Sequence, residues 1–271
     1  MSLQNIELQI KEVNIKEVNI KEVNIKEVNI KETYSPLTCV SGFWPIKNKH
    51  GNLFAEWFKK TLRINCPYVF FTTKEGIEII KKYRLDLPTH YREYNIEDFY
   101  TFKYKDKMIT HQEHCPSVEL NLIWNEKMIM MEKASQINHF NSEFFCWVDA
   151  GVCVYREHEP PSTPFPDVRK LNDLPKDRLI YSSSGIWTSK LVQNNRYYHY
   201  ISGTSYILHK DIVTHFTDMY KKYMERIFMD NTINRNIIWT DQVILTHMFK
   251  NYPYKFYKLS DGYGMNLITL S

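Results

Sequence analysis

The sequence predicts an α/β domain, with helices packed on the faces of a sheet, that follows an N-terminal arm of short repeats. Short apolar runs alternate with longer segments of helical apolar spacing from residue 37 onward, which is the order expected for βαβ units. Hydrophobic residues make up 43% and charged residues 24% of the 271-residue chain, so core material is ample. Residues 10–32 instead repeat the pentapeptide IKEVN. We therefore expect two parts, the repeat arm at 1–34 and one domain at 35–271.

The elements of the domain follow from these runs in chain order. In the first half we expect strands at 37–46, 67–73, 90–96 and 144–148, and helices at 52–64, 74–85 and 117–140. In the second half we expect strands at 178–187, 197–208 and 254–259, helices at 211–228 and 241–252, and a proline-rich loop at 158–168. The pattern changes at residue 34 and at no later position, so we expect no further domain boundary.

The IKEVN repeat has a period of five, which fits no ordinary amphipathic element. On an α-helix each repeat rotates the apolar residues by about 140°, so they spread around the helix. On a strand an odd period sends Ile10 and Ile15 to opposite faces. In the frame VNIKE the segment resembles the pentapeptide-repeat pattern, but it covers little more than one coil, and a solenoid needs about three stacked units. A free-standing coil, an arm for self-association and a flexible tail all stay open, and the second would make a homo-oligomer.

Charge and cysteine content narrow the class of protein. The net charge of +4 and the pI near 8.6 are too mild to indicate nucleic-acid binding, for which a domain pI above about 9 is expected. They would help attract an anionic substrate. The five cysteines are an odd number, so we expect buried thiols in a reducing compartment. The N-terminus carries charges where a signal peptide needs an apolar run, and no uncharged apolar window reaches about 18 residues. We therefore expect a cytoplasmic protein without a membrane span.

The stretch FFCWVDAGVCV places Asp149 inside a nearly continuous apolar run. An isolated carboxylate is costly to bury, so this residue needs a partner or a position at a strand end. Ligands of open α/β sheets bind beyond the carboxyl ends of strands, and Ala150 and Gly151 would leave room for a close approach. Asp149 would then hold a divalent cation that bridges diphosphate oxygens. The alternative is a strand-end cap, or an ion pair with a buried Lys or Arg.

Two further charged positions belong to predicted helices. Lys127 falls in the middle of an apolar face of the long helix. It should either extend to solvent or meet an anion, for which phosphate and Asp149 are both candidates. Asp241 and Gln242 begin a later helix with Thr240 as its N-cap, and the helix dipole alone favours an acid there. The functional alternative is an acid and an amide presented to a sugar hydroxyl.

Other motifs carry weaker signals. Gly203 lies between two β-like runs, as expected for a bulge or tight bend, or for a backbone that lies close to a ligand. The segment HQEHC, with His111, His114 and Cys115, has metal-like spacing, but no second pair completes a tetrahedral zinc site. The sequence contains no P-loop, no G-x-G-x-x-G and no G-x-S-x-G elbow. It therefore lacks the common signatures of phosphate-binding loops and of serine hydrolases.

The order of several segments resembles a known family. These segments are TCVSGFW, PYVFFT, CWVDAG, ISGTSYILHKDIVTHF and WTDQVILTHMFKNYP, which together span roughly residues 37–260. In this order they resemble the HtrL/YibB-like family, whose bacterial and large-DNA-virus members are similar to GT-A-type glycosyltransferases. WVDAG is the most specific piece, and TDQ followed by an apolar helix supports it. A viral origin would place the protein in the host cytoplasm or the virion.

The resemblance implies a GT-A-like fold, with a mixed, mostly parallel nucleotide-binding sheet flanked by helices. The usual metal motif of such enzymes is D-x-D, which holds Mn²⁺ or Mg²⁺ against the nucleotide diphosphate. The motif here is Asp149-Ala150-Gly151, so the first Asp matches and the second is a glycine. Asp149 would bind the metal with help from phosphates and waters, or would contact the ribose instead.

The resemblance also implies the residues of the site. Donor-binding residues would lie at strand ends and on the long helix: Ser41, Gly42, Phe43, Lys127, Asp149, Gly151, Gly203 and Thr204. The first three would line the nucleotide pocket, the lysine would reach the nucleotide or phosphate, and the last two would face the donor sugar or the acceptor. Asp241 would be the catalytic base, with Gln242 beside it. It would contact the donor sugar instead if stereochemistry is retained.

The predicted function is transfer of a sugar from a nucleotide donor, with a UDP-sugar first among the candidates, to an unknown glycan or protein acceptor. The alternative is a catalytically weak nucleotide-sugar-binding or structural protein that assembles through the repeat arm. A metal-dependent nuclease that uses Asp149 and Asp241 is less favoured. No run of basic and aromatic residues follows a nucleic-acid backbone.

Overall fold

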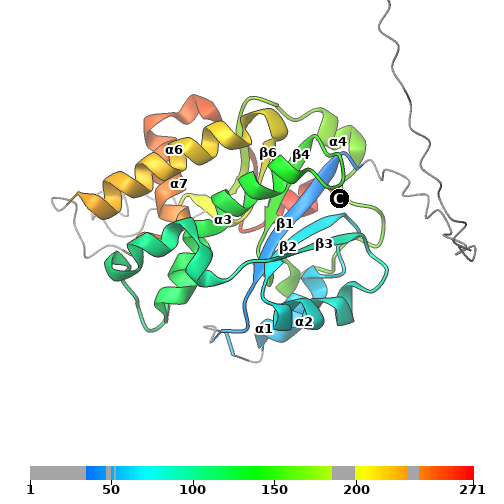
Figure 1. The fold of residues 1–271 in the computed structure, drawn as a ribbon. Coiled ribbons are helices and arrows are strands. Elements are labelled where there is room, and N and C mark those ends of the chain that lie inside the picture. Colours follow the sequence, from blue (N-terminus) through cyan, green and yellow to red (C-terminus); the bar gives the residue numbers. More distant parts are fainter. Residues whose placement is uncertain (1–34, 47–49, 52, 185–198, 231–237) are drawn as a thin grey trace, which may run out of the picture. The chain divides into compact units, whose positions relative to one another are not determined.

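The computed structural model (Figure 1) describes the domain in five ranges: 35–46, 50–51, 53–184, 199–230 and 238–271. The repeat arm at 1–34 lies outside the described residues, so its three alternatives and the predicted boundary stay predictions. The ends of the strands predicted at 178–187 and 197–208 also lie partly outside them.

Seven strands form one sheet in the order β3-β2-β1-β4-β6-β5-β7. Their bounds are β1 (Leu37–Phe43), β2 (Tyr68–Thr72), β3 (Thr89–Glu93), β4 (Phe144–Val148), β5 (Leu179–Ser183), β6 (Ile201–His209) and β7 (Phe256–Asp261). Strands β1 to β4 are parallel neighbours, and β5 pairs in parallel with β7. Strand β6 runs antiparallel to both β4 and β5. The mixed, mostly parallel sheet predicted from the sequence is confirmed.

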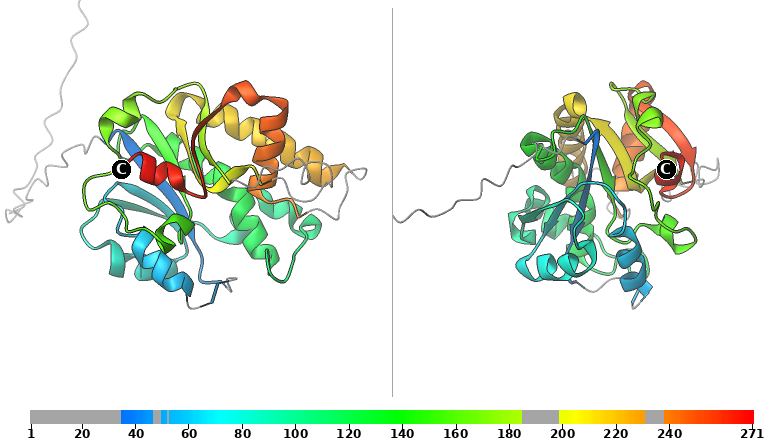
Figure 2. Two further views of the ribbon diagram at one scale, coloured as in Figure 1. Left: turned by 180° about the vertical axis from the view of Figure 1, so that it is seen from behind. Right: turned by 90° about the vertical axis from the view of Figure 1, so that its right-hand side faces the viewer.

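Helices cover both faces of this sheet (Figures 1 and 2). They are α1 (Leu53–Thr61), α2 (Lys74–Arg84), α3 (Val118–Ile137), α4 (Val168–Asn172), α6 (Lys210–Met229), α7 (Asp241–Asn251) and α8 (Met265–Thr269). Apolar residues of α3, α6 and α7 share one buried cluster with one face of the sheet. Those of α1, α2 and α8 share a second cluster with the opposite face. Three layers result, helices over sheet over helices, as expected for an α/β domain.

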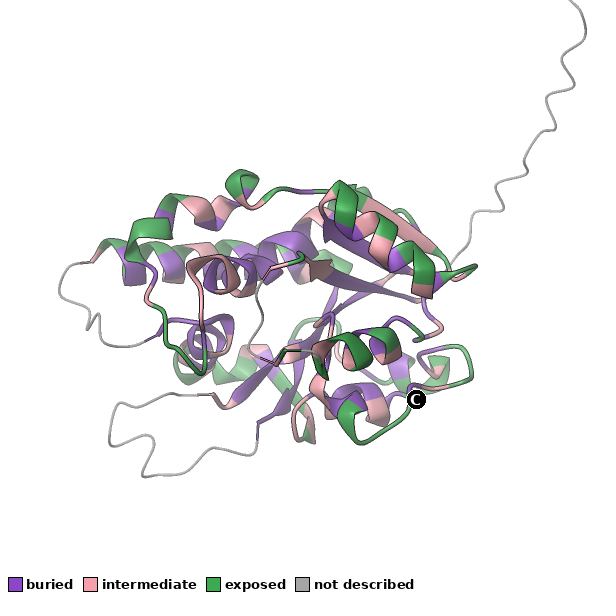
Figure 3. Ribbon diagram, turned by 90° about the horizontal axis from the view of Figure 1, so that it is seen from below, coloured by how far each residue is buried: buried purple, intermediate pink, exposed green. Residues whose placement is uncertain are grey.

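Strands β2 and β4 are buried along their whole length (Figure 3). Both faces of each strand meet a helical layer, so β2 and β4 read as continuous apolar runs rather than alternating ones. Their aromatic side chains are all at most 2% exposed: Tyr68, Phe70, Phe71, Phe144, Phe145 and Trp147. The edge strand β3 is only partly buried. A polar side chain in this part of the chain therefore needs a partner or a position at the end of a strand.

Chain order creates a switch point between β1 and β4. The chain runs outward from β1 through β2 to β3 and then returns to place β4 on the other side of β1. The two connections leave the carboxyl ends of β1 and β4 in opposite directions, which opens a crevice there. Phe43 ends β1, and Asp149 follows the last residue of β4.

The predicted elements are present with small differences in extent. Strand β1 ends at Phe43, three residues short of its predicted end, because Pro45 has no N–H to donate. Helix α3 ends at Ile137, where Asn138 adopts a left-handed conformation with φ 41°. The sequence did not predict the short helices α4 and α8, or the 3₁₀ helices Ile96–Asp98, Tyr100–Lys107, Cys153–Arg156 and Pro253–Lys255. None of the helices among the described residues has both the length and the apolar character of a transmembrane segment.

Candidate active site

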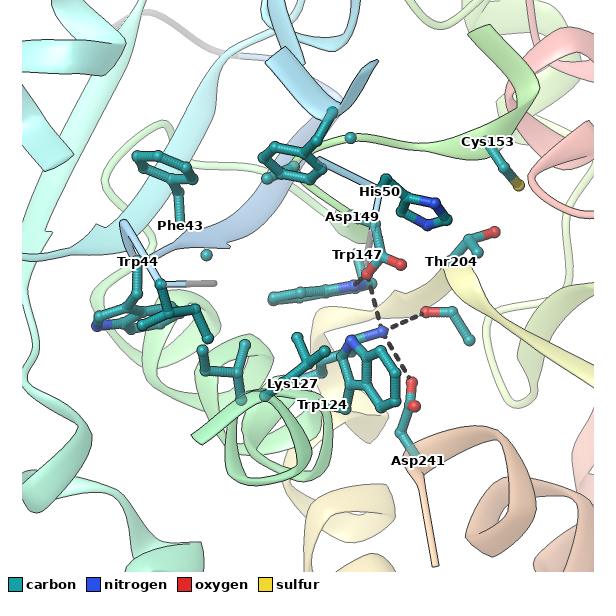
Figure 4. Close-up of a pocket in the computed structure, with 18 of the residues that line it drawn as sticks. Phe43, Trp44, His50, Trp124, Lys127, Trp147, Asp149, Cys153, Thr204 and Asp241 are labelled. Carbon is teal, nitrogen blue, oxygen red and sulfur yellow. Dashed lines mark hydrogen bonds and ion pairs between the residues drawn. The ribbon is translucent and has the colours of Figure 1, made fainter. Parts of the chain in front are cut away.

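A cavity of about 500 Å³ lies at the carboxyl ends of β1 and β4, within the switch-point crevice (Figure 4). Side chains from α1, α3, α7 and the loops after β1 and β4 complete its wall. Its lining is largely aromatic and apolar, with these charged or polar members: His50, Lys127, Asp149, Arg156, Thr204, Asp241 and Gln242. This is the size and character of a small-molecule site, which typically measures about 300–1,000 Å³.

Lys127 lies at the centre of the polar wall. Helix α3 crosses the sheet with one face toward the cavity, and this face carries Leu120, Ile123, Trp124 and Lys127. The Lys127 side chain is 4% exposed. Its Nζ atom lies 2.8 Å from Oδ1 of Asp149 and 3.0 Å from Oδ2 of Asp241. It also donates a hydrogen bond of 3.0 Å to the carbonyl oxygen of Gly203.

These contacts explain how a lysine is tolerated in an apolar stripe. An ammonium group has three protons, and Lys127 has three acceptors within reach, two of them charged. Burial alone would lower the pKa of Lys127, but the two carboxylates outweigh it and raise the pKa above its ordinary value. The group therefore stays charged. Of the two sequence-based alternatives, extension to solvent is wrong and contact with an anion is confirmed.

Asp149 is held at the end of β4 by three contacts. The indole Nε1 of Trp147 donates a hydrogen bond of 2.8 Å to Oδ1, the same oxygen that meets Lys127. The backbone N–H of Asp149 donates to the carbonyl oxygen of Thr204 on β6, at 2.9 Å. The side chain is 26% exposed, so it faces the cavity. Asp149 is thus a strand-end carboxylate paired with a buried lysine, one of the alternatives that the sequence left open.

Asp241 begins α7 and is almost completely buried, with a side chain 4% exposed. Burial raises its pKa to about 6, and the nearby charge of Asp149 adds to this, against the opposing effect of Lys127. Its Oδ2 atom lies 3.0 Å from Nζ of Lys127, and no other donor among the described residues reaches it. Thr240 occupies the N-cap position, but its hydroxyl does not cap the helix. This carboxylate is therefore desolvated and able to accept a further hydrogen bond.

Helix α3 also fixes the start of α7. The side-chain amide of Asn125 donates a hydrogen bond of 2.9 Å to the carbonyl oxygen of Trp239, two residues before Asp241. Tyr220 on α6 donates in turn to Oδ1 of Asn125, at 3.1 Å. All these groups are buried, so the network is shielded from water and its geometry is well defined. The position of Asp241 is therefore set by the same helix that carries Lys127.

Close packing of side chains accounts for the glycines of the site. A Cβ at Gly203 would overlap the carboxylate of Asp241 and lie 2.5 Å from Cγ of Gln242. A Cβ at Gly151 would lie 2.7 Å from the ring of Phe54. Gly203 also donates its backbone N–H to Oε1 of Gln242, at 3.2 Å. These residues bring a strand, a helix start and an aromatic ring together, which is the reason the sequence needs glycine there.

The structure brings nine of the ten predicted site residues to the cavity wall, and Ser41 is the exception. The nine are Gly42, Phe43, Lys127, Asp149, Gly151, Gly203, Thr204, Asp241 and Gln242. Ser41 is fully buried and does not line the cavity, because its hydroxyl donates a hydrogen bond of 2.7 Å to the carbonyl oxygen of Val148. It joins β1 to the end of β4, so the expected pocket-lining role of Ser41 is not supported.

Several lining residues were not identified from the sequence. They are Trp44, His50, Phe54, Trp124, Trp147, Cys153, Arg156 and Tyr263, among others. Helical spacing in the sequence could have placed Trp124 in the site, since it lies on the same face of the long helix as Lys127. Arg156 had none, because it belongs to a short 3₁₀ helix within a segment of no periodic pattern.

A sequence profile of the HtrL_YibB family, described as bacterial proteins of unknown function, matches residues 89–268. This range is more than half of the chain, and it contains Lys127, Asp149 and Asp241. The chain belongs to the HtrL_YibB family. Strands β1 and β2, which precede the matched range, complete the sheet of this HtrL_YibB protein. No curated protein matches its sequence.

Solved structures resemble the fold of this HtrL_YibB protein at low sequence identity. Mouse xyloside xylosyltransferase 1 in its apo form is 11% identical, with a TM-score of 0.51, over 82% of this chain and 84% of that one. A glycosyltransferase involved in glycosylation of the major capsid of PBCV-1 is 15% identical over 83% and 82%, with a TM-score of 0.41. The 4-diphosphocytidyl-2C-methyl-D-erythritol synthase from Anaerococcus prevotii is 12% identical over 88% and 90%, also at 0.41. Only the first score exceeds 0.5, and it supports the GT-A-like fold predicted from the sequence.

The described residues of the cavity offer two carboxylates, Asp149 and Asp241, as oxygen ligands for Mn²⁺ or Mg²⁺. Both ions prefer several oxygen ligands. Across the described ranges, no cluster of three or more Asp, Glu, His or Cys side chains is arranged to hold a metal ion. The ammonium group of Lys127 lies between the two carboxylates that are present, and it would repel a second cation bound to either of them. Metal binding at Asp149 stays a prediction that this arrangement does not favour.

Proposed function

We propose that this HtrL_YibB protein is a glycosyltransferase that uses a nucleotide-sugar donor, with a UDP-sugar as the first candidate. The observation that carries the proposal is the position of the Lys127–Asp149–Asp241 cluster in a cavity at the switch point of the sheet. Ligands of doubly wound sheets bind at such a point. A buried acid with a raised pKa beside a specific charge partner, in a cavity, is typical of a functional site.

The aromatic part of the cavity suits the nucleoside of the donor. Phe43 stacks with Phe54, with 6.4 Å between the ring centroids, and Trp124 and Trp147 lie nearer the charged cluster (Figure 4). Aromatic rings stack with nucleobases through their faces, and each such contact contributes about 1–3 kcal/mol in other nucleotide-binding proteins. Asp149 lies next to Trp147, where its free oxygen would accept a hydrogen bond from a ribose or sugar hydroxyl.

The buried carboxylate of Asp241 suits the role of a general base. In an inverting transfer, the acceptor oxygen attacks the anomeric carbon, the bond from that carbon to the donor phosphate breaks, and the hydroxyl proton passes to the base. With a pKa of about 6, Asp241 is mostly ionised at neutral pH and yet basic enough to accept the proton. Apart from Lys127, no donor among the described residues reaches its Oδ2 atom, so this oxygen could also accept a hydrogen bond from an acceptor hydroxyl. If the reaction retains stereochemistry, the same group would contact the donor sugar.

The test is release of nucleoside diphosphate from a panel of UDP-, GDP- and TDP-sugars, with and without Mn²⁺. We expect release from at least one donor and its loss in the variant Asp149→Ala, with the fold retained by circular dichroism. The variant Asp218→Ala, at an exposed acid on α6 outside the cavity, is the matched control. Donor binding without release from any member of the panel would instead support a catalytically weak binding protein.

A further inference from the structure

The charge of a nucleotide-sugar donor is not matched by the Lys127 cluster alone. Asp149, Asp241 and Lys127 together carry one net negative charge when both acids are ionised. The three acceptors around Nζ already equal the number of protons that an ammonium group donates. A diphosphate brings further negative charge, and the transfer reaction increases the charge on the leaving group. Binding therefore needs a cation that is not already engaged by carboxylates.

Arg156 supplies such a cation on the same cavity wall. It follows β4 by eight residues, in the 3₁₀ helix Cys153–Arg156, and lines the cavity together with Asp149 and Gly151. Among the described residues, no carboxylate lies within ion-pair distance of its guanidinium group, unlike Lys127. Its charge is therefore available to an anionic ligand.

The guanidinium group is also oriented in advance. Its central carbon lies 3.9 Å from the centre of the Trp57 ring on α1. One terminal nitrogen lies 3.4 Å from Nε2 of His50, which also lines the cavity. Stacking on an aromatic face restrains the group and leaves its N–H edge free to form paired hydrogen bonds with phosphate oxygens. Little conformational freedom is then lost when an anion binds.

We propose that Arg156 binds the diphosphate of the donor without a divalent cation, since the ammonium of Lys127 already lies between the two acids that would hold one. The proposal rests on the proposed function, and it names the residue and the charge that bind the donor. Lys127 keeps Asp149 and Asp241 together, Arg156 offsets one of the negative charges of the diphosphate, and Trp57 and His50 position Arg156. The ligand class is a nucleoside diphosphate or its sugar ester.

The test is calorimetric titration of the full chain with UDP, GDP and TDP and with uridine, in EDTA and in Mn²⁺. The variant Arg156→Gln removes the charge, and Arg92→Gln is its control, at an exposed arginine on the edge strand β3 outside the cavity. Charge-assisted hydrogen bonds of a guanidinium to phosphate support an expected loss of about 10- to 100-fold in UDP affinity. Uridine carries no phosphate, so Arg156→Gln should bind it as the wild type does, which also shows that the variant is folded.

Each outcome decides between the two proposals. Equal UDP affinity in EDTA and in Mn²⁺, with the loss confined to Arg156→Gln and to UDP, supports the inference. UDP binding that requires Mn²⁺, or that is unchanged in Arg156→Gln, overturns it and leaves the glycosyltransferase proposal standing. Failure of UDP, GDP and TDP to bind in either buffer overturns both.

Discussion

Replacing Lys127 by Met tests whether the buried cluster has the geometry described above. Met has a similar length and is tolerated in apolar surroundings, so it fills the space of the lysine stem without its charge. The change leaves the Oδ2 atom of Asp241 buried without a charged partner, since no other donor among the described residues reaches it. Asp149 keeps its hydrogen bond from Trp147 and part of its exposure to the cavity. The loss of folding stability in this variant should therefore come mainly from the unpaired carboxylate of Asp241.

The expected loss follows from the burial of both partners. The side chains of Lys127 and Asp241 are each 4% exposed, so solvent screens their interaction little. Removing one partner of a buried ion pair costs about 3–5 kcal/mol. For a domain of this size, each kcal/mol shifts the melting temperature by about 2–4 °C, so a fall of about 6–20 °C is expected.

Scanning calorimetry at two pH values checks this reasoning. Asp241 has a folded pKa above its unfolded value, so its ionisation destabilises the folded state as pH rises from about 4 through the folded pKa of about 6. Lys127→Met raises that pKa further, so the loss of stability should be larger at pH 8 than at pH 5. Adding Asp241→Asn to this variant should restore part of the lost stability. Lys222→Met, at an exposed lysine on α6, is the control. If the melting temperature of Lys127→Met at pH 8 lies within about 2 °C of that of the wild type, the buried ion pair between Lys127 and Asp241 is contradicted.

Three further predictions follow from the site and the arm. Gly203→Ala should lower the free energy of unfolding by about 1–3 kcal/mol and reduce donor turnover, because its Cβ would overlap Asp241 and Gln242; chemical denaturation and the release assay measure both. The rate of transfer should rise between pH 5 and pH 7 as Asp241, with its pKa of about 6, loses its proton and becomes a base, and a flat pH profile would exclude that role. Deleting residues 1–33 should reduce the mass measured by light scattering if the arm mediates self-association, whereas an unchanged mass removes that alternative.

The sequence predicted the elements of the sheet because each is a local pattern. The run FFCWV and the helical spacing around Lys127 are both visible within about twenty residues, and both elements are present. The family resemblance placed Asp149 and Asp241 in one site, and the structure brings both carboxylates to the same ammonium group. Local periodicity could show that Lys127 faces the core, but not which anion it meets there.

The features that were missed depend on contacts between distant segments. Ser41 was expected in the pocket, but its hydroxyl bonds to Val148, 107 residues away. The reason for glycine at 203 is the side chain of Asp241, which no pattern near residue 203 reveals. Arg156 reaches the cavity through an irregular segment and acquires its orientation from Trp57 on α1. Such contacts become visible only when the strand order is known.

The most direct test of the proposed function compares the wild type with Asp241→Asn in the release of nucleoside diphosphate, at saturating donor, in EDTA and in Mn²⁺. The variant keeps the size of the side chain but cannot accept the acceptor proton. The proposal predicts release by the wild type from at least one nucleotide-sugar and a fall of at least about 100-fold in the variant, with donor binding retained. Equal release by the two proteins, or none by the wild type from any donor with or without Mn²⁺, would contradict it.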